Sequence, residues 1–270
     1  MGLEFSDTHC HLYFDVYEGD RQQVVERARA AGVVRILAPG IDLETSRAAI
    51  ELADKYPEIY AAVGIHPNSA GEWNPKMMGE LRLLARHPKV VAIGEIGLDY
   101  YRERTPRDVQ VQVFLEQLAL AAEIGLPVVL HNRQASGDLV SILTKWRALL
   151  SQAGSMLVDR PGVLHSFTSD LATARMVMHL GFWIGITGPV TFRNAAELQM
   201  VVQSLPVERL LIETDSPFLT PHPMRGKRNE PAYVVKIAET LAEFHGHSVD
   251  TVAKITTNNA NQLFLWRKSF

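Results

Sequence analysis

The chain alternates between short apolar runs and longer stretches in which apolar residues recur at spacings of three and four. The runs are rich in β-branched residues and apolar almost throughout, as in strands that are buried on both faces. They predict eight strands, at residues 5–9, 33–38, 59–65, 90–93, 127–130, 162–164, 182–186 and 209–212. The periodic stretches predict intervening helices, among them residues 20–31, 43–55, 77–87 and 108–124.

Buried strands that are joined by helices predict an α/β protein with a parallel sheet. Eight such units favour closure into a single (β/α)8 TIM barrel, with residues 248–259 packed as a C-terminal extra helix. An open, doubly wound sheet is the main alternative, but it would bind its ligand in one crevice between two strands. Polar residues suited to a site follow strands 1, 3, 4, 5, 6 and 8, which favours the barrel.

The length of 270 residues is close to the roughly 250 typical of such a barrel, although length alone also allows two smaller domains. No linker, low-complexity tract or internal repeat divides the chain, so we expect one domain over residues 1–270. A net charge of -3 excludes a strong overall attraction to nucleic acid or to an anionic membrane. Any polyanion must therefore be bound by a local patch or through bound cations.

The single cysteine, Cys10, excludes an internal disulfide framework and is typical of a reducing compartment. No apolar stretch reaches the roughly 18 residues of a membrane-spanning helix, and the first residues lack the features of a signal peptide. We therefore expect a cytoplasmic protein with no membrane contact and no obligate protein partner.

Chelating side chains follow several of the predicted strands directly. In a barrel the C-terminal ends of all strands meet at one rim, so side chains that are distant in the sequence can converge there. Histidine nitrogens and carboxylate oxygens are ligands for divalent cations. The pattern therefore predicts a metal site built from His9, His11, Glu95, His131, His165 and Asp215.

These candidates differ in the role that their chemistry allows. His9 and His11 stand two residues apart, which places both imidazoles on one face of an extended strand. Glu95 has two oxygens and is the candidate for bridging two cations, while Asp215 is expected to be both a ligand and a general base. Glu213 shares a strand face with Asp215, and it either binds a further cation or supports another ligand.

Substrate contacts are expected from residues near the same rim. His66, directly before Pro67, either meets a substrate oxygen or phosphate or caps the end of its strand. A basic loop beyond Asp215 is the best local element for binding phosphate. Its candidate contacts are Arg225, Lys227, Arg228 and Asn229, with Arg102 and Arg104 as supplements. The segment from Asn229 to Pro231 also has the pattern of a helix start, which needs no contact with substrate.

Longer motifs resemble those of the TatD-type metal-dependent hydrolases, a branch of the amidohydrolase superfamily of TIM barrels. The resemblance runs through most of the chain, and its most specific strings are Glu-Thr-Asp-Ser-Pro at 213–217 and Arg-Gly-Lys-Arg-Asn-Glu-Pro at 225–231. Shorter matches are Asp-Thr-His-Cys-His at 7–11, Gly-Ile-His-Pro at 64–67, Gly-Glu-Ile-Gly-Leu-Asp-Tyr at 94–100, His131 and His-Ser-Phe at 165–167.

The resemblance implies two divalent cations bridged by Glu95, with three ligands on one cation and two on the other. The first set is His9, His11 and Asp215, and the second is His131 and His165. It also implies hydrolysis of phosphodiester bonds in DNA for many members, and ester or deacylase activity for others. The donor set suits Zn, Mn, Fe or Co, and catalysis on nucleic acid could equally use Mg.

We therefore expect a metal-dependent hydrolase that cleaves phosphodiester bonds of DNA, with Asp215 and Glu95 as its catalytic residues and nucleic acid as its partner. A small-molecule amidohydrolase, lactonase, carboxylic esterase or deacylase is the alternative, because the same metal chemistry cleaves all these bonds. A catalytically inert metal-binding protein is the third possibility.

Overall fold

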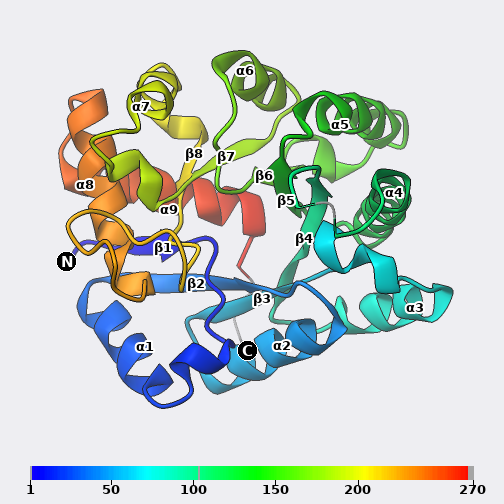
Figure 1. Ribbon diagram of the computed structural model, residues 1–270, viewed down its shortest axis with the longest axis horizontal. Coiled ribbons are helices and arrows are strands. Elements are labelled where there is room, and N and C mark those ends of the chain that lie inside the picture. Colours follow the sequence, from blue (N-terminus) through cyan, green and yellow to red (C-terminus); the bar gives the residue numbers. More distant parts are fainter. Residues whose placement is uncertain (1, 103, 267–270) are drawn as a thin grey trace.

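A computed structural model describes residues 2–102 and 104–266 of the chain, and within them eight parallel strands form one sheet in the order β1 to β8 (Figure 1). The ends of the predicted 1–270 domain, residues 1 and 267–270, lie outside the described residues. The strands are β1 (Phe5–Asp7), β2 (Val33–Pro39), β3 (Ile59–Val63), β4 (Val90–Asp99), β5 (Val128–Arg133), β6 (Gly162–Leu164), β7 (Trp183–Ile186) and β8 (Leu210–Ile212). Each strand pairs with the next one along the chain, which confirms the barrel and excludes the doubly wound sheet.

Helices surround the strands in the alternating order that the sequence predicts (Figure 1). They are α1 (Arg21–Ala30), α2 (Leu43–Lys55), α3 (Pro75–Leu84), α4 (Arg107–Ile124), α5 (Ser136–Gln152), α6 (Leu171–His179), α7 (Ala196–Gln203), α8 (Val234–His245) and α9 (Val249–Phe264). Helix α3 begins earlier than predicted, because Asn74 accepts a hydrogen bond from the Lys76 amide and Pro75 occupies the first helical position. Among the described helices, none is long and apolar enough to cross a membrane.

The barrel closes between β1 and β8 through main-chain hydrogen bonds that lie mostly beyond the strand ends. The Thr8 amide donates to the Ile212 carbonyl over 3.2 Å, and the Asp215 amide donates to the His9 carbonyl over 2.8 Å. An isolated bridge pairs Cys10 with Ser216. Strand β1 is thus shorter than predicted, and the seam that closes the barrel carries three of the candidate metal ligands.

Helix α9 fills the end of the barrel at which the strands begin. Asn259 donates to the carbonyls of Val207 and Leu210 at the start of β8, and Thr257 donates to the carbonyl of Glu4 before β1. The apolar side chains of α9 and the segment after it pack with those inside the barrel. This buried cluster includes Leu37, Tyr60, Val129, Val163, Trp183, Leu211, Ala260, Leu263, Phe264 and Trp266. The predicted extra helix is therefore longer than expected and forms part of the core.

Removing a buried side chain of α9, which fills the end of the barrel, should destabilise the whole fold. Phe264 is 3% exposed, so Phe264→Ala removes a buried ring, and we expect the free energy of unfolding to fall by about 3–5 kcal/mol. The neighbouring Leu265 is 55% exposed, and Leu265→Ala should change stability by less than about 0.5 kcal/mol. Urea denaturation measures both variants. Similar losses in the two would show that α9 does not close the core.

Candidate metal centre

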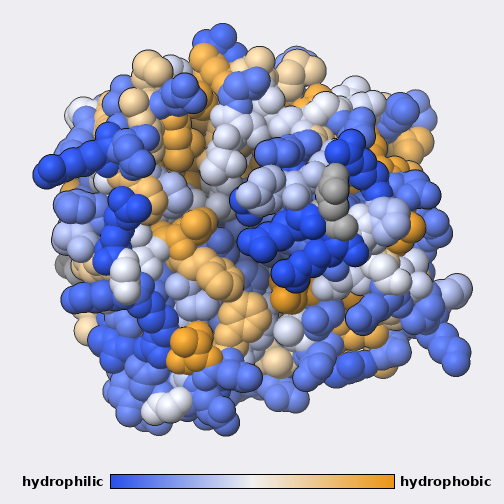
Figure 2. All heavy atoms as spheres, viewed as in Figure 1, coloured by the Kyte–Doolittle hydropathy of each residue, from blue (hydrophilic) through white to orange (hydrophobic). Residues whose placement is uncertain are grey.

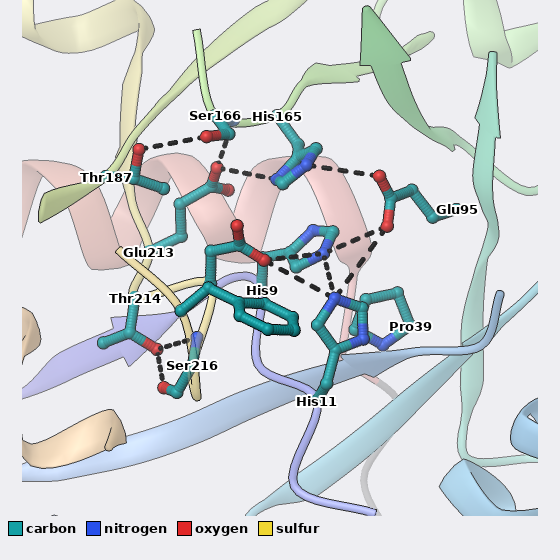
Figure 3. Close-up of polar contacts among 12 residues, drawn as sticks. His9, His11, Pro39, Glu95, His165, Ser166, Thr187, Glu213, Thr214 and Ser216 are labelled. Carbon is teal, nitrogen blue, oxygen red and sulfur yellow. Dashed lines mark hydrogen bonds and ion pairs between the residues drawn. The ribbon is translucent and has the colours of Figure 1, made fainter. Parts of the chain in front are cut away.

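The six predicted ligands converge at the rim of the barrel opposite α9. Figure 3 shows four of them, His9, His11, Glu95 and His165. Glu95 and His131 lie inside β4 and β5 rather than after them, because both strands continue further than the sequence predicted. Gly97 makes this extension possible, since a Cβ there would lie 2.1 Å from the carbonyl oxygen of His131. Glycine thus allows the two strands to pair closely where their ligands meet.

Glu95 is the centre of the cluster, and its two carboxylate oxygens face different sets of histidines. Oε2 lies 3.4 Å from Nε2 of His9 and 3.9 Å from Nε2 of His11. Oε1 faces three further rings, at 2.8 Å from Nδ1 of His131, 3.3 Å from Nε2 of His165 and 3.5 Å from Nε2 of His66. A carboxylate with one oxygen toward each set has the geometry of a bridging ligand.

Asp215 completes the set that faces Oε2. Its Oδ1 lies 3.5 Å from Nε2 of His11 and 3.8 Å from Nε2 of His9, and those two nitrogens are only 3.2 Å apart. Asp215 has a φ of +54°, a left-handed conformation that aspartate tolerates better than most residues. The backbone at this position turns the carboxylate toward the histidines of the closing seam.

The arrangement of donor atoms fits divalent cations. Three groups of side chains bring all their ligand atoms within 4.8 Å of one another. They are His9, His11 and Asp215; His9, Glu95 and His165; and His66, Glu95 and His131. All these side chains are buried or partly buried. Imidazoles and carboxylates this close together are stabilised when they share a cation, since an uncompensated charge in such a place is unfavourable.

The outer nitrogens of three histidines have partners that fix the direction of their rings. The Tyr13 hydroxyl donates to the Pro39 carbonyl, so it accepts from Nδ1 of His11 over 2.7 Å and leaves Nε2 free to bind a cation. His165 meets Glu213 through Nδ1 at 3.2 Å, and His131 meets Asp99 through Nε2 at 3.3 Å. Each ring thus presents its other nitrogen to Glu95 or Asp215.

Glu213 lies behind His165 and is fully buried. Its carboxylate accepts hydrogen bonds from the Ser166 amide and from the Thr8 hydroxyl. A Cβ on Gly185 would lie 2.5 Å from one of its oxygens, so glycine leaves the space that this carboxylate fills. With these partners, the geometry favours the supporting role for Glu213 over that of a ligand for a further cation.

The sequence did not reveal Asp99 and Tyr13. Asp99 lies four residues after Glu95, a spacing that puts both side chains on one face of a continuous strand. That signal was available, but it was hidden because the predicted strand ended at residue 93. Tyr13 follows the two histidines in a loop segment without strand periodicity, and no sequence pattern marks it.

His66 has the capping role that the sequence left open, and it caps the helix that follows its strand. Its Nδ1 accepts a hydrogen bond from the Asn68 amide over 3.0 Å, which caps the short helix Pro67–Glu72. Its Nε2 faces Glu95. Burial and the neighbouring His131 lower the pKa of His66 to about 3, so the ring is neutral. A neutral ring that accepts through Nδ1 carries its proton on Nε2.

The histidines keep the buried carboxylates ionised. Burial alone would raise the pKa of Glu95, but His165, His66 and His131 together hold it well below its usual range. Burial also opposes ionisation of Asp215, and its neighbours His11, His165 and His9 lower its pKa. The buried anion of Glu95 and the partly buried anion of Asp215 form an electrostatic setting at the rim that attracts cations.

The basic loop after Asp215 is divided between two environments. Arg228 pairs with Asp20 over 2.6 Å and stacks on Tyr17, and Asn229 is fully buried with its amide donating to the Thr214 and Phe218 carbonyls. The structure therefore uses both residues to anchor the loop. Arg225 and Lys227 are exposed. Arg225 borders a pocket of about 420 Å³ with Phe192, Arg193, Asn194 and His222.

Residues 6–265 match the model of the family described as TatD related DNase. Among curated relatives, the uncharacterised metal-dependent hydrolase YabD of Bacillus subtilis is 45% identical over 258 residues, which cover 96% of this chain and 98% of YabD. The 3'-5' ssDNA/RNA exonuclease TatD of a Rahnella species is 40% identical over 255 residues, which cover 92% of this chain and 93% of that enzyme.

A solved structure also has a fold similar to that of this chain. The crystal structure of YJJV, a TatD homologue from Escherichia coli, superposes with a TM-score of 0.88 at 33% sequence identity, and the match covers 97% of this chain and 98% of that one.

Replacing the carboxylate behind His165 tests the role of Glu213. We expect Glu213→Gln to weaken binding of Mn²⁺ by about 10- to 100-fold, because His165 loses a charged partner, while the number of ions bound per chain stays the same. Isothermal titration calorimetry measures both quantities. Glu208→Gln, an exposed position before β8, is the control and should bind as the unaltered protein does. Loss of one bound ion in Glu213→Gln would instead make Glu213 a ligand.

Proposed function

The chain belongs to the TatD-related DNase family, and from this premise we propose that it is a divalent-metal-dependent hydrolase that cleaves phosphodiester bonds of DNA. The observation that carries the proposal is the placement of the two oxygens of Glu95 toward separate sets of histidines. Relatives named as ssDNA/RNA exonucleases support nucleic acid as the substrate. A cytoplasmic location stays a prediction from the single cysteine.

Use of a divalent cation follows from the family and from the clustered donor atoms. We propose that the cations number two, with Glu95 between them. His9, His11 and Asp215 would hold one, and His131 and His165 would hold the other. Zn, Mn, Fe, Co and Mg are all compatible with this donor set. Bound cations of this kind acidify a water molecule and stabilise negative charge on the group that is attacked.

Asp215 is the residue that we propose to accept the proton of the attacking water. Its Oδ1 is directed at His9 and His11, which leaves Oδ2 as the oxygen that takes the proton. Its side chain is 15% exposed, against 4% for Glu95, so water and substrate can reach it. Glu95 acts differently, because it is enclosed by histidines and fixes the spacing of the two half-sites.

His66 is positioned to hold an oxygen of the substrate. Because its Nδ1 accepts from the Asn68 amide, its Nε2 carries a hydrogen directed at the centre of the cluster. A donor in this position would orient a phosphate oxygen and stabilise the charge that develops on it. The place of His66 near Glu95 and His131 is compatible with this contact to substrate. A role as metal ligand is not, because a ring with its hydrogen on Nε2 has no lone pair on that nitrogen to offer a cation.

Arginines around the rim provide the positive charge that a nucleic acid needs. Arg102 and Arg104 follow β4, and Arg133 ends β5; all three are exposed. Asp99 accepts from the Arg102 amide and also meets His131, so this loop is tied to the cluster. In the basic loop after Asp215 we assign phosphate contacts to Arg225 and Lys227. We do not assign them to Arg228 and Asn229, because the side chains of these two residues already contact other groups of the protein.

The amidohydrolase, lactonase and deacylase alternatives depend on the same metal chemistry. The exposed arginines favour phosphodiesters, since a small neutral ester or amide needs no such positive surface. A parallel assay of single-stranded DNA, a lactone and an amide under one metal condition separates these functions. Cleavage of the lactone without cleavage of DNA would favour the alternative, and turnover of none of them would favour an inert metal-binding protein.

The general-base assignment predicts the behaviour of Asp215→Asn. At saturating Mn²⁺, we expect cleavage of a fluorescent single-stranded oligonucleotide to slow by about 10²- to 10⁴-fold, because the amide cannot accept the proton. Asp108→Asn, in the exposed first turn of α4, is the matched control and should be fully active. Normal turnover in Asp215→Asn with metal still bound would refute the assignment.

The phosphate contact assigned to Arg133 predicts an altered salt dependence. A lost contact with a single strand should flatten the plot of log KM against log salt concentration by about 0.7. We expect this change in Arg133→Ala, together with a higher KM at low salt. Lys145→Ala removes an exposed positive charge on α5 and serves as the control. Equal slopes in both variants would show that Arg133 does not contact phosphate.

A further inference from the structure

Two phenylalanine rings border the metal centre on the side of β1 and β8. Phe14 lies in the segment after β1, with its ring stacked on that of His11 at a centroid distance of 5.1 Å. Phe218 follows Asp215 by three residues, and its ring lies 6.0 Å from Phe14 and 6.4 Å from His11. We call this pair of rings, Phe14 and Phe218, the aromatic wall.

Within the wall, Phe14 is partly buried, whereas Phe218 has an exposed side chain on a firmly held main chain. The Phe218 side chain is 53% exposed, although burying a phenylalanine ring is among the larger stabilising contributions available to a protein. Its main chain is fixed at both ends, because its amide donates to the Asp215 carbonyl over 2.9 Å and its carbonyl accepts from the buried Asn229 side chain. An apolar ring that is held at the rim of a site in this way is preorganised to contact a ligand.

The surface around the hollow at the rim is asymmetric. Figure 2 shows apolar side chains along one side of the hollow and a group of hydrophilic side chains across from them. The exposed residues Arg102 and Arg104 follow β4, and the exposed Arg133 ends β5. Both strands lie across the barrel from β1 and β8 (Figure 1). A polymer with flat apolar rings on one edge and negative charges on the other complements such a surface.

We propose that the aromatic wall is a stacking site for an unpaired nucleobase of the nucleotide next to the cleaved phosphate, and this inference rests on the proposed function. With the phosphate at the metal centre, the base lies against Phe14 and Phe218 and the backbone continues toward the arginines. Every base has a flat π-face, so the contact tolerates any sequence. A base within a duplex is already stacked on both faces, so the wall selects a single-stranded end.

Replacing the exposed ring tests the site. The substrates are two single-stranded oligonucleotides that differ only in the terminal nucleotides, which are normal in one and abasic in the other, with each end tested in turn. We expect Phe218→Ala to raise KM for the normal strand by roughly 5- to 150-fold and to change kcat little. KM for the abasic strand should stay the same, because that strand has no base to stack.

Two further variants separate stacking from structure. Phe218→Trp keeps a flat ring and should preserve the KM of the unaltered protein, and Phe14→Leu keeps the bulk of a partly buried side chain but should raise KM for the normal strand alone. Leu149→Ala changes an apolar residue of α5 that is 62% exposed and should have no effect.

Equal changes in KM for normal and abasic strands would overturn the stacking site. So would an unchanged KM in Phe218→Ala accompanied by dissociation of a dimer in sedimentation, because the wall would then be an interface between copies of the chain. Failure of the unaltered protein to cleave any oligonucleotide with Mn²⁺ or Mg²⁺ is a different result, since it would refute the proposed function itself.

Discussion

The negative charge of a carboxylate that is buried in a protein must be compensated by neighbouring groups. Five histidine rings, each with a nitrogen within 4 Å of a carboxylate oxygen, compensate the charge of Glu95. The rings repel one another when protonated and compete for the same oxygens, so their orientations cannot be left to the cluster alone. Contacts behind it fix three of them, through Tyr13, Asp99 and Glu213. Buried polar groups of this kind rigidify a site when all their partners are present. The surrounding fold must therefore position Tyr13, Asp99 and Glu213 as accurately as it positions the ligands themselves.

The barrel meets that requirement because the seam that closes it, between β1 and β8, runs through the segments that carry the site. Hydrogen bonds between the segments that carry His9 and Asp215 join the first strand to the last, so the order of the ligands and the integrity of the barrel depend on the same contacts. At the opposite end α9 fills the interior with Phe264 and its neighbours, which gives the strands a packed core beneath the polar rim. Stability is concentrated at one end of the barrel and chemistry at the other, as is usual for this fold.

The barrel and the position of each candidate ligand along the chain could be predicted because both depend on local patterns. Apolar runs mark the strands, and each ligand follows such a run or continues it. Contacts across the barrel could not be predicted in the same way. The pairing of Arg228 with Asp20 links residues 208 positions apart, and nothing near Arg228 distinguishes a phosphate contact from a structural one. Asp99 was missed because a strand interrupted by glycines was predicted to end before Glu95, and Phe218 because an exposed aromatic ring has no pattern until its neighbours are known.

The site combines a charge-rich centre with an aromatic side and a basic side. The stacking and phosphate-binding roles that we propose for these two sides both require cations at the centre between them. A crystal grown with Mn²⁺ and measured at an X-ray energy where manganese scatters anomalously tests this most directly. We expect two anomalous peaks about 3.5 to 4 Å apart, one beside each oxygen of Glu95. A single peak, or peaks that do not flank Glu95, would contradict it.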